Sequence, residues 1–269
     1  MAVTNFIPTI WSKKILDDLE LECKLVENCW REYEGDAKQA GSVKILGIGD
    51  VTIGDYDKTD IDIQEVNDKG QILTIDQAKY FAFVFDNVDK AQSVPGLLEG
   101  TRAEGVRGLA EARDAFVAGL IKTGTNVTTA TALNEDAVKT AIDNALVALK
   151  ERNCHEEMVI ELTPSAAMVF LNSLTIKSTD NPEYIKKGVI GYYHGCKVIE
   201  SNGLAKDTTH AYCAIRAKKA IAFVGQLEKL EAMPMERRFG DLVKGLDVYG
   251  GKVIDNNRLQ VVKIPVKAS

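Results

Sequence analysis

Residues 41–76 constrain the fold of this chain more than any other segment. Short alternating stretches at residues 43–45, 51–53, 61–63 and 72–75 are separated by glycines and acidic residues, which predicts a long two-stranded excursion. This hairpin has too few apolar side chains to form its own core, and an isolated hairpin is marginally stable in water. We therefore expect it to lie against another surface. Its acidic residues include Asp50, Asp55, Asp57, Asp60 and Asp62.

The N-terminal region shows the pattern of an amphipathic helix. Ser12 can cap this helix, and apolar residues recur at three- and four-residue steps until Gly35 ends it. These apolar residues are Ile15, Leu19, Cys23, Val26, Trp30 and Tyr33. Further leucines lie off the stripe, so the helix carries more apolar surface than one contact would cover, which favours a second partner.

The longest helical pattern runs over residues 95–122. Its apolar residues share a face centred on Val106, and we assign charged residues that include Asp114 to the opposite face. Arg102 and Arg113 project into the apolar face. A long cation in that position either extends to water or pairs with a carboxylate, and the sequence leaves both alternatives open.

The rest of the chain mixes strands and helices. Residues 79–86 form an almost wholly apolar strand, as expected where both faces of a strand are covered. A second helix is predicted after its cap Asn134, and strands follow from residue 158 to the C-terminal strand at residues 258–264. Because helices and strands do not alternate regularly, we predict an α+β fold rather than a doubly wound parallel sheet.

Composition and motifs point away from catalysis. The sequence has no phosphate-binding glycine loop, no nucleophile elbow and no zinc-protease helix motif. Its five cysteines are odd in number and include no Cys-x-x-Cys pair, which favours buried thiols over disulfides or a zinc site. The net charge of -6 weighs against tight binding of nucleic acid, and the N-terminus has no signal peptide pattern. We expect no catalytic residue, cofactor, metal or membrane segment.

Several short sequence stretches occur in an order that is typical of a known family. Phe6-Ile7-Pro8 and Trp11-Ser12 precede the N-terminal helix, Lys79-Tyr80-Phe81-Ala82-Phe83 leads toward the long helix, and Glu236-Arg237-Arg238-Phe239-Gly240-Asp241 precedes the last strands. Over nearly the whole chain, this order resembles the major capsid proteins of tailed bacteriophages, which have the Hong Kong 97-type capsid fold. No single motif is decisive, and their occurrence together carries the resemblance.

The resemblance implies a particular division of the chain. It implies an α+β protein with an N-terminal arm, an extended β-hairpin loop that lies across a neighbouring subunit, a peripheral domain with a long spine helix, and an axial domain. The implied ranges are 1–36 for the arm, 37–77 for the loop, 78–133 for the peripheral domain with its spine helix, 134–229 for the axial domain and 230–269 for the return to the peripheral domain.

The function implied by the resemblance is structural and not enzymatic. The chain would be a major capsid protein whose copies form pentamers and hexamers of an icosahedral phage or prophage head around double-stranded DNA. Implied partners are other copies, a separate scaffolding protein, a portal protein, and DNA contacted weakly and without sequence specificity. The implied location is the virion, after assembly in the host bacterial cytoplasm. The candidates for subunit contacts are Asp50, Asp55, Asp57, Asp60, Asp62, Arg102, Arg113, Arg237, Arg238, Trp11 and Trp30.

Two alternatives remain open at this point. An encapsulin-like protein compartment would have the same fold but enclose cargo enzymes. A soluble α+β enzyme with an unrecognised site would instead form a stable monomer or dimer.

Overall fold

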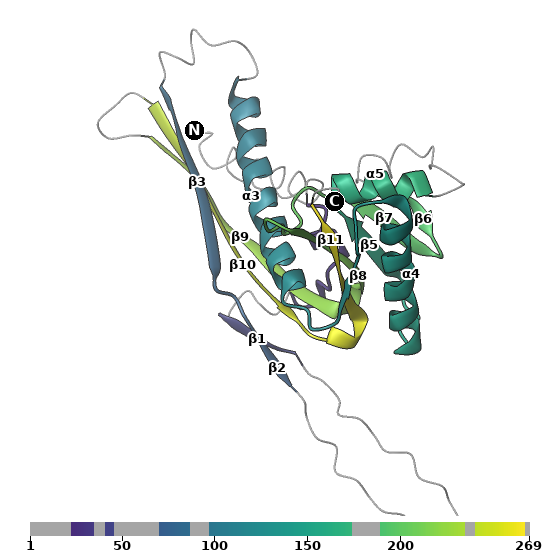
Figure 1. Cartoon of the computed structure of the whole chain (residues 1–269). Coiled ribbons are helices and arrows are strands. Elements are labelled where there is room, and N and C mark those ends of the chain that lie inside the picture. Colours follow the sequence, from purple (N-terminus) through teal and green to yellow (C-terminus); the bar gives the residue numbers. More distant parts are fainter. Residues whose placement is uncertain are drawn as a thin grey trace, which may run out of the picture.

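The computed structural model describes residues 23–34, 41–45, 70–86, 97–173, 189–234 and 240–266. Three sheets organise these parts of the chain, with two, three and six strands. Figure 1 shows the six-stranded sheet and its helices at one end of an elongated molecule, and the three-stranded sheet with the long helix α3 extending away from it. The mixed helix and sheet architecture confirms the predicted α+β class.

The six-stranded sheet has the order β4-β11-β8-β5-β7-β6. Its strands are β4 (Val127–Thr129), β11 (Leu259–Pro265), β8 (His210–Ala217), β5 (Met158–Leu162), β7 (Cys196–Glu200) and β6 (Val189–Tyr193). Helix α4 (Glu135–Glu151) packs on strands of this sheet and on α5 (Pro164–Ser173). Every residue of β5 is buried, so both faces of the sheet are covered at its centre.

The three-stranded sheet is antiparallel and much longer. It has the order β3-β10-β9, with β3 (Gln77–Asp86), β10 (Gly240–Val253) and β9 (Ile221–Pro234). Helix α3 (Leu97–Lys122) packs along one face of this sheet. The short turn η5 (Lys218–Ala220) connects β8 directly to β9, so the two large sheets share a continuous path of the chain.

The base of the predicted extended loop is a two-stranded antiparallel sheet of β1 (Ser42–Ile45) and β2 (Gln71–Thr74). It lies beside β10 at Gly250, where an added Cβ would overlap the backbone of Thr74. Glycine is therefore required for this close approach. The pairing confirms the two ends of the predicted hairpin, and residues 46–69 lie outside the described residues.

Several predicted elements are confirmed. Helix α3 buries the predicted face around Val106, and α4 begins with the predicted cap, since the side chain of Asn134 accepts a hydrogen bond from the N–H of Ala137 at 2.8 Å. All five cysteines are buried free thiols, as expected: Cys23, Cys29, Cys154, Cys196 and Cys213.

Three predictions about local structure are wrong. Within residues 23–34 the predicted N-terminal helix is replaced by two short 3-10 turns, η2 (Val26–Asn28) and η3 (Glu32–Glu34). Asp114, assigned to the solvent-facing side of the long helix, is only 7% exposed. Strand β3 was expected to be covered on both faces, but its Tyr80 is 78% exposed. The contacts described next explain the first two differences.

Candidate assembly site

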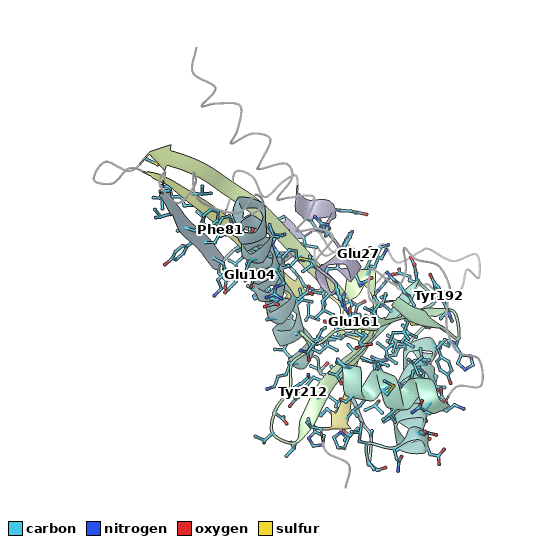
Figure 2. All side chains as sticks on the ribbon, turned by 90° about the horizontal axis from the view of Figure 1, so that it is seen from above. Glu27, Phe81, Glu104, Glu161, Tyr192 and Tyr212 are labelled. Atoms are coloured by element: carbon cyan, nitrogen blue, oxygen red, sulfur yellow. The ribbon has the colours of Figure 1, made fainter. Side chains whose placement is uncertain are left out.

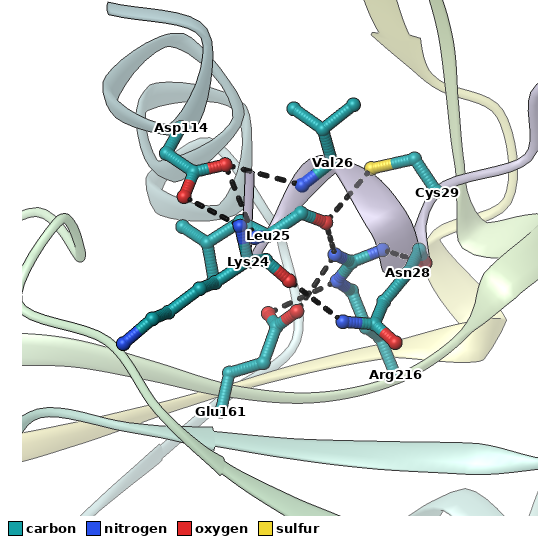
Figure 3. Close-up of polar contacts among 8 residues, drawn as sticks. All are labelled: Lys24, Leu25, Val26, Asn28, Cys29, Asp114, Glu161 and Arg216. Atoms are coloured by element: carbon teal, nitrogen blue, oxygen red, sulfur yellow. Dashed lines mark hydrogen bonds and ion pairs between the residues drawn. The ribbon is translucent and has the colours of Figure 1, made fainter. Parts of the chain in front are cut away.

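The N-terminal segment that precedes η3, residues 23–30, is named the strap below. It lies where α3, the six-stranded sheet and β9 meet, and Figure 3 shows its polar contacts. The carboxylate of Asp114 on α3 accepts hydrogen bonds from three successive main-chain N–H groups of the strap. The distances are 2.9 Å from Lys24, 3.1 Å from Leu25 and 3.2 Å from Val26. A carboxylate at the start of the turn satisfies N–H groups that a helix would otherwise leave unpaired.

Arg216 on β8 holds the carbonyl side of the same turn. Its guanidinium donates to the carbonyl oxygens of Leu25 and Asn28, at 2.9 and 2.6 Å. The same guanidinium donates to both carboxylate oxygens of Glu161 on β5, at 3.1 and 2.7 Å. Arg216 and Glu161 are both fully buried, and the pair with its additional hydrogen bonds satisfies the requirement for burying charge. We call Asp114, Glu161 and Arg216 the clasp.

The clasp holds one acid that has no cation of its own. Glu161 pairs with Arg216, whereas Asp114 is stabilised by main-chain N–H groups alone among the described hydrogen bonds. Burial raises the pKa of Asp114 to about 6, although the three N–H groups oppose this shift. Of the three clasp residues, Asp114 is therefore the one whose charge is stabilised only by the main chain of the strap.

A second buried ion pair joins α3 to the three-stranded sheet. Arg113 donates to both carboxylate oxygens of Asp247 on β10, at 2.8 and 2.5 Å, and both side chains are buried. Gly225 on β9 leaves room for the guanidinium, because an added Cβ there would lie 3.2 Å from its Cζ atom. Of the two alternatives that the sequence left open for Arg113, the structure shows a carboxylate pair, made within the same chain.

Trp30 ends the strap and connects it to the base of the loop. Its main-chain N–H donates to the carbonyl of Ile221 at 2.9 Å, and its carbonyl accepts from the main-chain N–H of Phe223 at 3.0 Å. These two bonds form a short parallel bridge to β9. Trp30 and Tyr33 pack against a small apolar cluster that includes residues of β1, β2 and β9. Within the described residues, the buried indole N–H of Trp30 has no hydrogen-bond acceptor.

The outer face of the three-stranded sheet exposes several apolar side chains next to the exposed Lys244. Tyr80 and Val84 on β3 are 78% and 49% exposed, and Met233 on β9 is 47% exposed. Val84 pairs with Leu242, which in turn pairs with Met233, so these three side chains form a row across the sheet. No described residue covers the exposed parts of this row. Exposed apolar side chains that lie together make this face a candidate for contact with another protein surface.

The remaining predicted contact residues are not placed by the structure. Trp11, Asp50, Asp55, Asp57, Asp60, Asp62, Arg237 and Arg238 lie outside the described residues, and the side chain of Arg102 is not described either. Among the residues that are described, no group of histidine, cysteine and acidic side chains could hold a metal ion. None of the helices in these ranges has the length and apolar character needed to span a bilayer.

Asp114, Glu161 and Arg216 were missed as interacting residues by the sequence reasoning. The helical repeat places Asp114 about 80° from Val106, at the border of the apolar face rather than opposite it. That border position is the signal that could have identified Asp114. Glu161 and Arg216 each interrupt an apolar strand, which is a signal for a buried pair, although nothing in the sequence connects one to the other.

Comparison with known proteins gives a consistent result. No family model and no curated protein matches the sequence. A chain from the structure of Mycobacterium phage Che8 matches with a TM-score of 0.71 and 27% identity, over 88% of this chain and 90% of that one. The bacteriophage PhiM1 mature capsid matches with a TM-score of 0.64 and 16% identity, over 84% and 83% of the two chains. The capsid of Cyanophage P-SCSP1u matches with a TM-score of 0.66 and 15% identity, over 86% of this chain and 85% of that one.

The fold of this chain is therefore the one that these phage structures share. More particularly, the comparisons confirm the predicted α+β Hong Kong 97-type capsid fold. A virus-like particle from Pyrococcus furiosus also matches, with a TM-score of 0.59 and 13% identity over 95% of this chain and 99% of that one.

Proposed function

We propose that this chain is the major capsid protein of a tailed phage or prophage, and that its copies form the pentamers and hexamers of an icosahedral head. The observation that carries the proposal is the match to phage structures over nearly the whole of both chains, with a TM-score of 0.71 for the phage Che8 chain. The exposed apolar side chains of Tyr80, Val84 and Met233 support it, because a shell subunit needs surface for its neighbours.

The proposal includes the partners and location that follow from such a role. These are a separate scaffolding protein during assembly in the host cytoplasm, a portal protein, and packaged double-stranded DNA that is contacted weakly. The acidic residues of the loop, together with Arg102, Arg237, Arg238 and Trp11, remain predicted subunit contacts. Trp30 is a further predicted contact, and its described contacts lie within the chain.

An encapsulin-like shell has weaker support. The virus-like particle from Pyrococcus furiosus matches with lower identity and a lower TM-score than the phage Che8 chain. No described feature favours a soluble enzyme over a shell subunit. Electron microscopy of purified particles distinguishes the two kinds of shell, since small uniform particles that form without scaffold and contain protein cargo would support the encapsulin-like alternative.

Shortening the extended loop tests the proposal directly. The last paired residues of the loop base are Ile45 and Gln71, so residues 47–70 can be replaced by Asn-Gly to close β1 and β2 with a short turn. We expect the variant to remain folded by circular dichroism but to form no closed shells in electron micrographs, because the support of the loop is intermolecular. Normal shells, or a variant that unfolds globally, would contradict the proposal.

A charge variant refines this test. Replacing Asp50, Asp55, Asp57, Asp60 and Asp62 together by asparagine keeps the length of the loop and removes its charge. The matched control replaces five exposed acids of α3 and α4 by their amides: Glu104, Glu111, Glu135, Asp136 and Glu151. We expect the loop variant to assemble less well than the control, and the difference to shrink as salt is added, because salt screens contacts between exposed charges.

A further inference from the structure

The turn that follows β7 contains the single Asn-Gly dipeptide of the sequence, at Asn202 and Gly203. Asn-Gly usually marks a type I′ turn, in which both residues adopt positive φ. Neither residue does so here, since the described residues with positive φ are Asn153, His194 and Gly195. Gly203 also has room for a side chain, because an added Cβ would meet its nearest atoms at 3.5 Å. The backbone therefore does not require glycine at this position.

Asparagine followed by glycine is a chemically reactive pair. The main-chain nitrogen of the glycine can attack the side-chain amide carbon of the asparagine, and glycine has no Cβ to hinder the approach. Water reaches both groups in this turn, because Asn202 and Gly203 are exposed. The N–H of Gly203 donates to Oγ of Ser201 at 3.2 Å and takes no part in strand pairing. A single hydrogen bond to a hydroxyl costs little to break.

A cation lies beside the amide group of Asn202. Nζ of Lys206 donates a hydrogen bond to Oδ1 of Asn202 at 2.7 Å. The main chain of Lys206 forms a bridge to Ala211 on β8, so the six-stranded sheet anchors this lysine. Negative charge develops on Oδ1 when the nitrogen of Gly203 attacks, and a cation at hydrogen-bond distance stabilises that charge. The turn thus holds the nucleophile, the amide and a stabilising cation together.

We propose that Asn202 and Gly203 form a deamidation site, at which Lys206 promotes conversion of the asparagine to aspartate or isoaspartate in the folded chain. The nitrogen of Gly203 bonds to Cγ of Asn202 and loses its proton to solvent. The bond from Cγ to Nδ2 breaks, and Nδ2 takes up a proton and leaves as ammonia. Water then opens the five-membered ring, at Cγ to give aspartate or at the main-chain carbonyl to give isoaspartate. Nothing is oxidised or reduced, and water is the co-reactant.

The product carries one more negative charge than the original chain. Because Lys206 lies within hydrogen-bond distance of the side chain at position 202, its ammonium group can pair with the new carboxylate. The turn also lies next to α3, since a Cβ added to Gly203 would lie 3.5 Å from Cβ of Asp114. An isoaspartyl linkage adds a methylene group to the main chain here and so changes this packing. The inference depends on chemistry within one chain and does not require the proposed function.

The first experiment uses the unmodified full chain. It is incubated under native conditions at mildly alkaline pH, and conversion at each asparagine is followed by peptide mass spectrometry. Asn172 and Asn257 are the internal comparisons, because both are exposed and the residue after each carries a side chain. We expect conversion at Asn202 to be about tenfold or more faster than at these two. Conversion at Asn202 that is no faster would overturn the proposal.

Gly203→Ala is the matched variant for the reacting pair. Its added methyl group makes only ordinary contacts, so the protein should remain folded, but the methyl group hinders attack on Asn202. We expect conversion at Asn202 to fall to the rates measured at Asn172 and Asn257. Conversion at the unmodified rate would show that the nitrogen of Gly203 is not the nucleophile, which contradicts the proposed reaction.

The second experiment tests Lys206. Lys206→Met removes the cation, and Lys206→Arg retains it. In the folded protein we expect Lys206→Met to slow conversion by about tenfold, less than the roughly hundredfold effect of a buried oxyanion donor, because Lys206 is exposed. Lys206→Arg should restore most of the rate. In urea, where the fold no longer holds the contact, all three proteins should convert at equal rates. Equal rates in the folded proteins, or the same slowing in urea, would count against promotion by Lys206.

Discussion

The six-stranded and three-stranded sheets differ in how much of their surface the chain itself covers. In the six-stranded sheet, β5 is buried along its full length by the protein's own helices, its strap and its neighbouring strands. In the three-stranded sheet, α3 covers one face, and Tyr80 and Val84 remain exposed on the other. The apolar sequence of a strand such as β3 therefore does not show which of its faces the chain covers. Three substitutions test this contrast, from the largest expected effect to the smallest.

The largest effect is expected at the covered face of the three-stranded sheet. Arg113→Met leaves the carboxylate of Asp247 buried without its partner, which should lower the free energy of unfolding by about 3–5 kcal/mol. Urea denaturation followed by circular dichroism measures the loss. If the inner face is as closed as the six-stranded sheet, the double variant Arg113→Met/Asp247→Leu should recover much of it.

The control for this substitution lies on the same helix. Arg107→Met removes a pair with Glu104 that is exposed to solvent, and exposed pairs contribute at most about 1 kcal/mol. Equal losses for Arg113→Met and Arg107→Met would show that the inner face of the three-stranded sheet is open to water, and the contrast between its two faces would then disappear.

A smaller effect is expected where Phe81 on β3 pairs with Gly245 on the neighbouring strand β10. The ring of Phe81 occupies the space next to Gly245, and an added Cβ would overlap it. Gly245→Ala should therefore cost about 1–3 kcal/mol through overpacking. Gly119→Ala, in α3, is the control, because no atom lies within 4 Å of the added Cβ and alanine favours helix by up to about 1 kcal/mol. A neutral result at Gly245, measured by thermal unfolding, would mean that the ring of Phe81 can move aside at little cost.

The smallest effect on stability is expected at the open face. Tyr80→Ser should change the free energy of unfolding by less than about 0.5 kcal/mol, because the side chain is largely exposed. Assembly is the more sensitive measurement: the concentration needed to form shells, determined by light scattering, should rise by about tenfold if Tyr80 anchors a contact.

Tyr192→Ser provides the comparison for this prediction. Tyr192 is 56% exposed on β6, far from Phe81 and the three-stranded sheet (Figure 2). Similar assembly by the Tyr80→Ser variant and the unmodified protein would show that the open face is not a subunit contact. A marked loss of stability in Tyr80→Ser would show that the face is not open at all.

The sequence predicts those parts of the molecule that depend on local patterns. The face of α3 around Val106, the cap of α4 at Asn134 and the pairing of the loop ends follow from periodicity and turn chemistry. The strap does not, because its helical pattern is overridden by Asp114 and Arg216, which are distant in the sequence. Similarly, the ion pair of Arg113 could not be predicted, because its partner Asp247 lies 134 residues away and no local pattern indicates it.

The turn η5 has a mechanical consequence. Three residues connect β8 to β9, and the carbonyl of Ala220 at the end of this turn accepts hydrogen bonds from Ile254 and Asp255, at 2.9 and 3.3 Å, just beyond β10. Two chain segments are thereby fixed at one corner between the sheets, which makes this corner stiff. If copies of the chain form a curved shell, the angle between neighbouring copies would have to change at the contacts between them. The angle between the two sheets of one copy would stay the same.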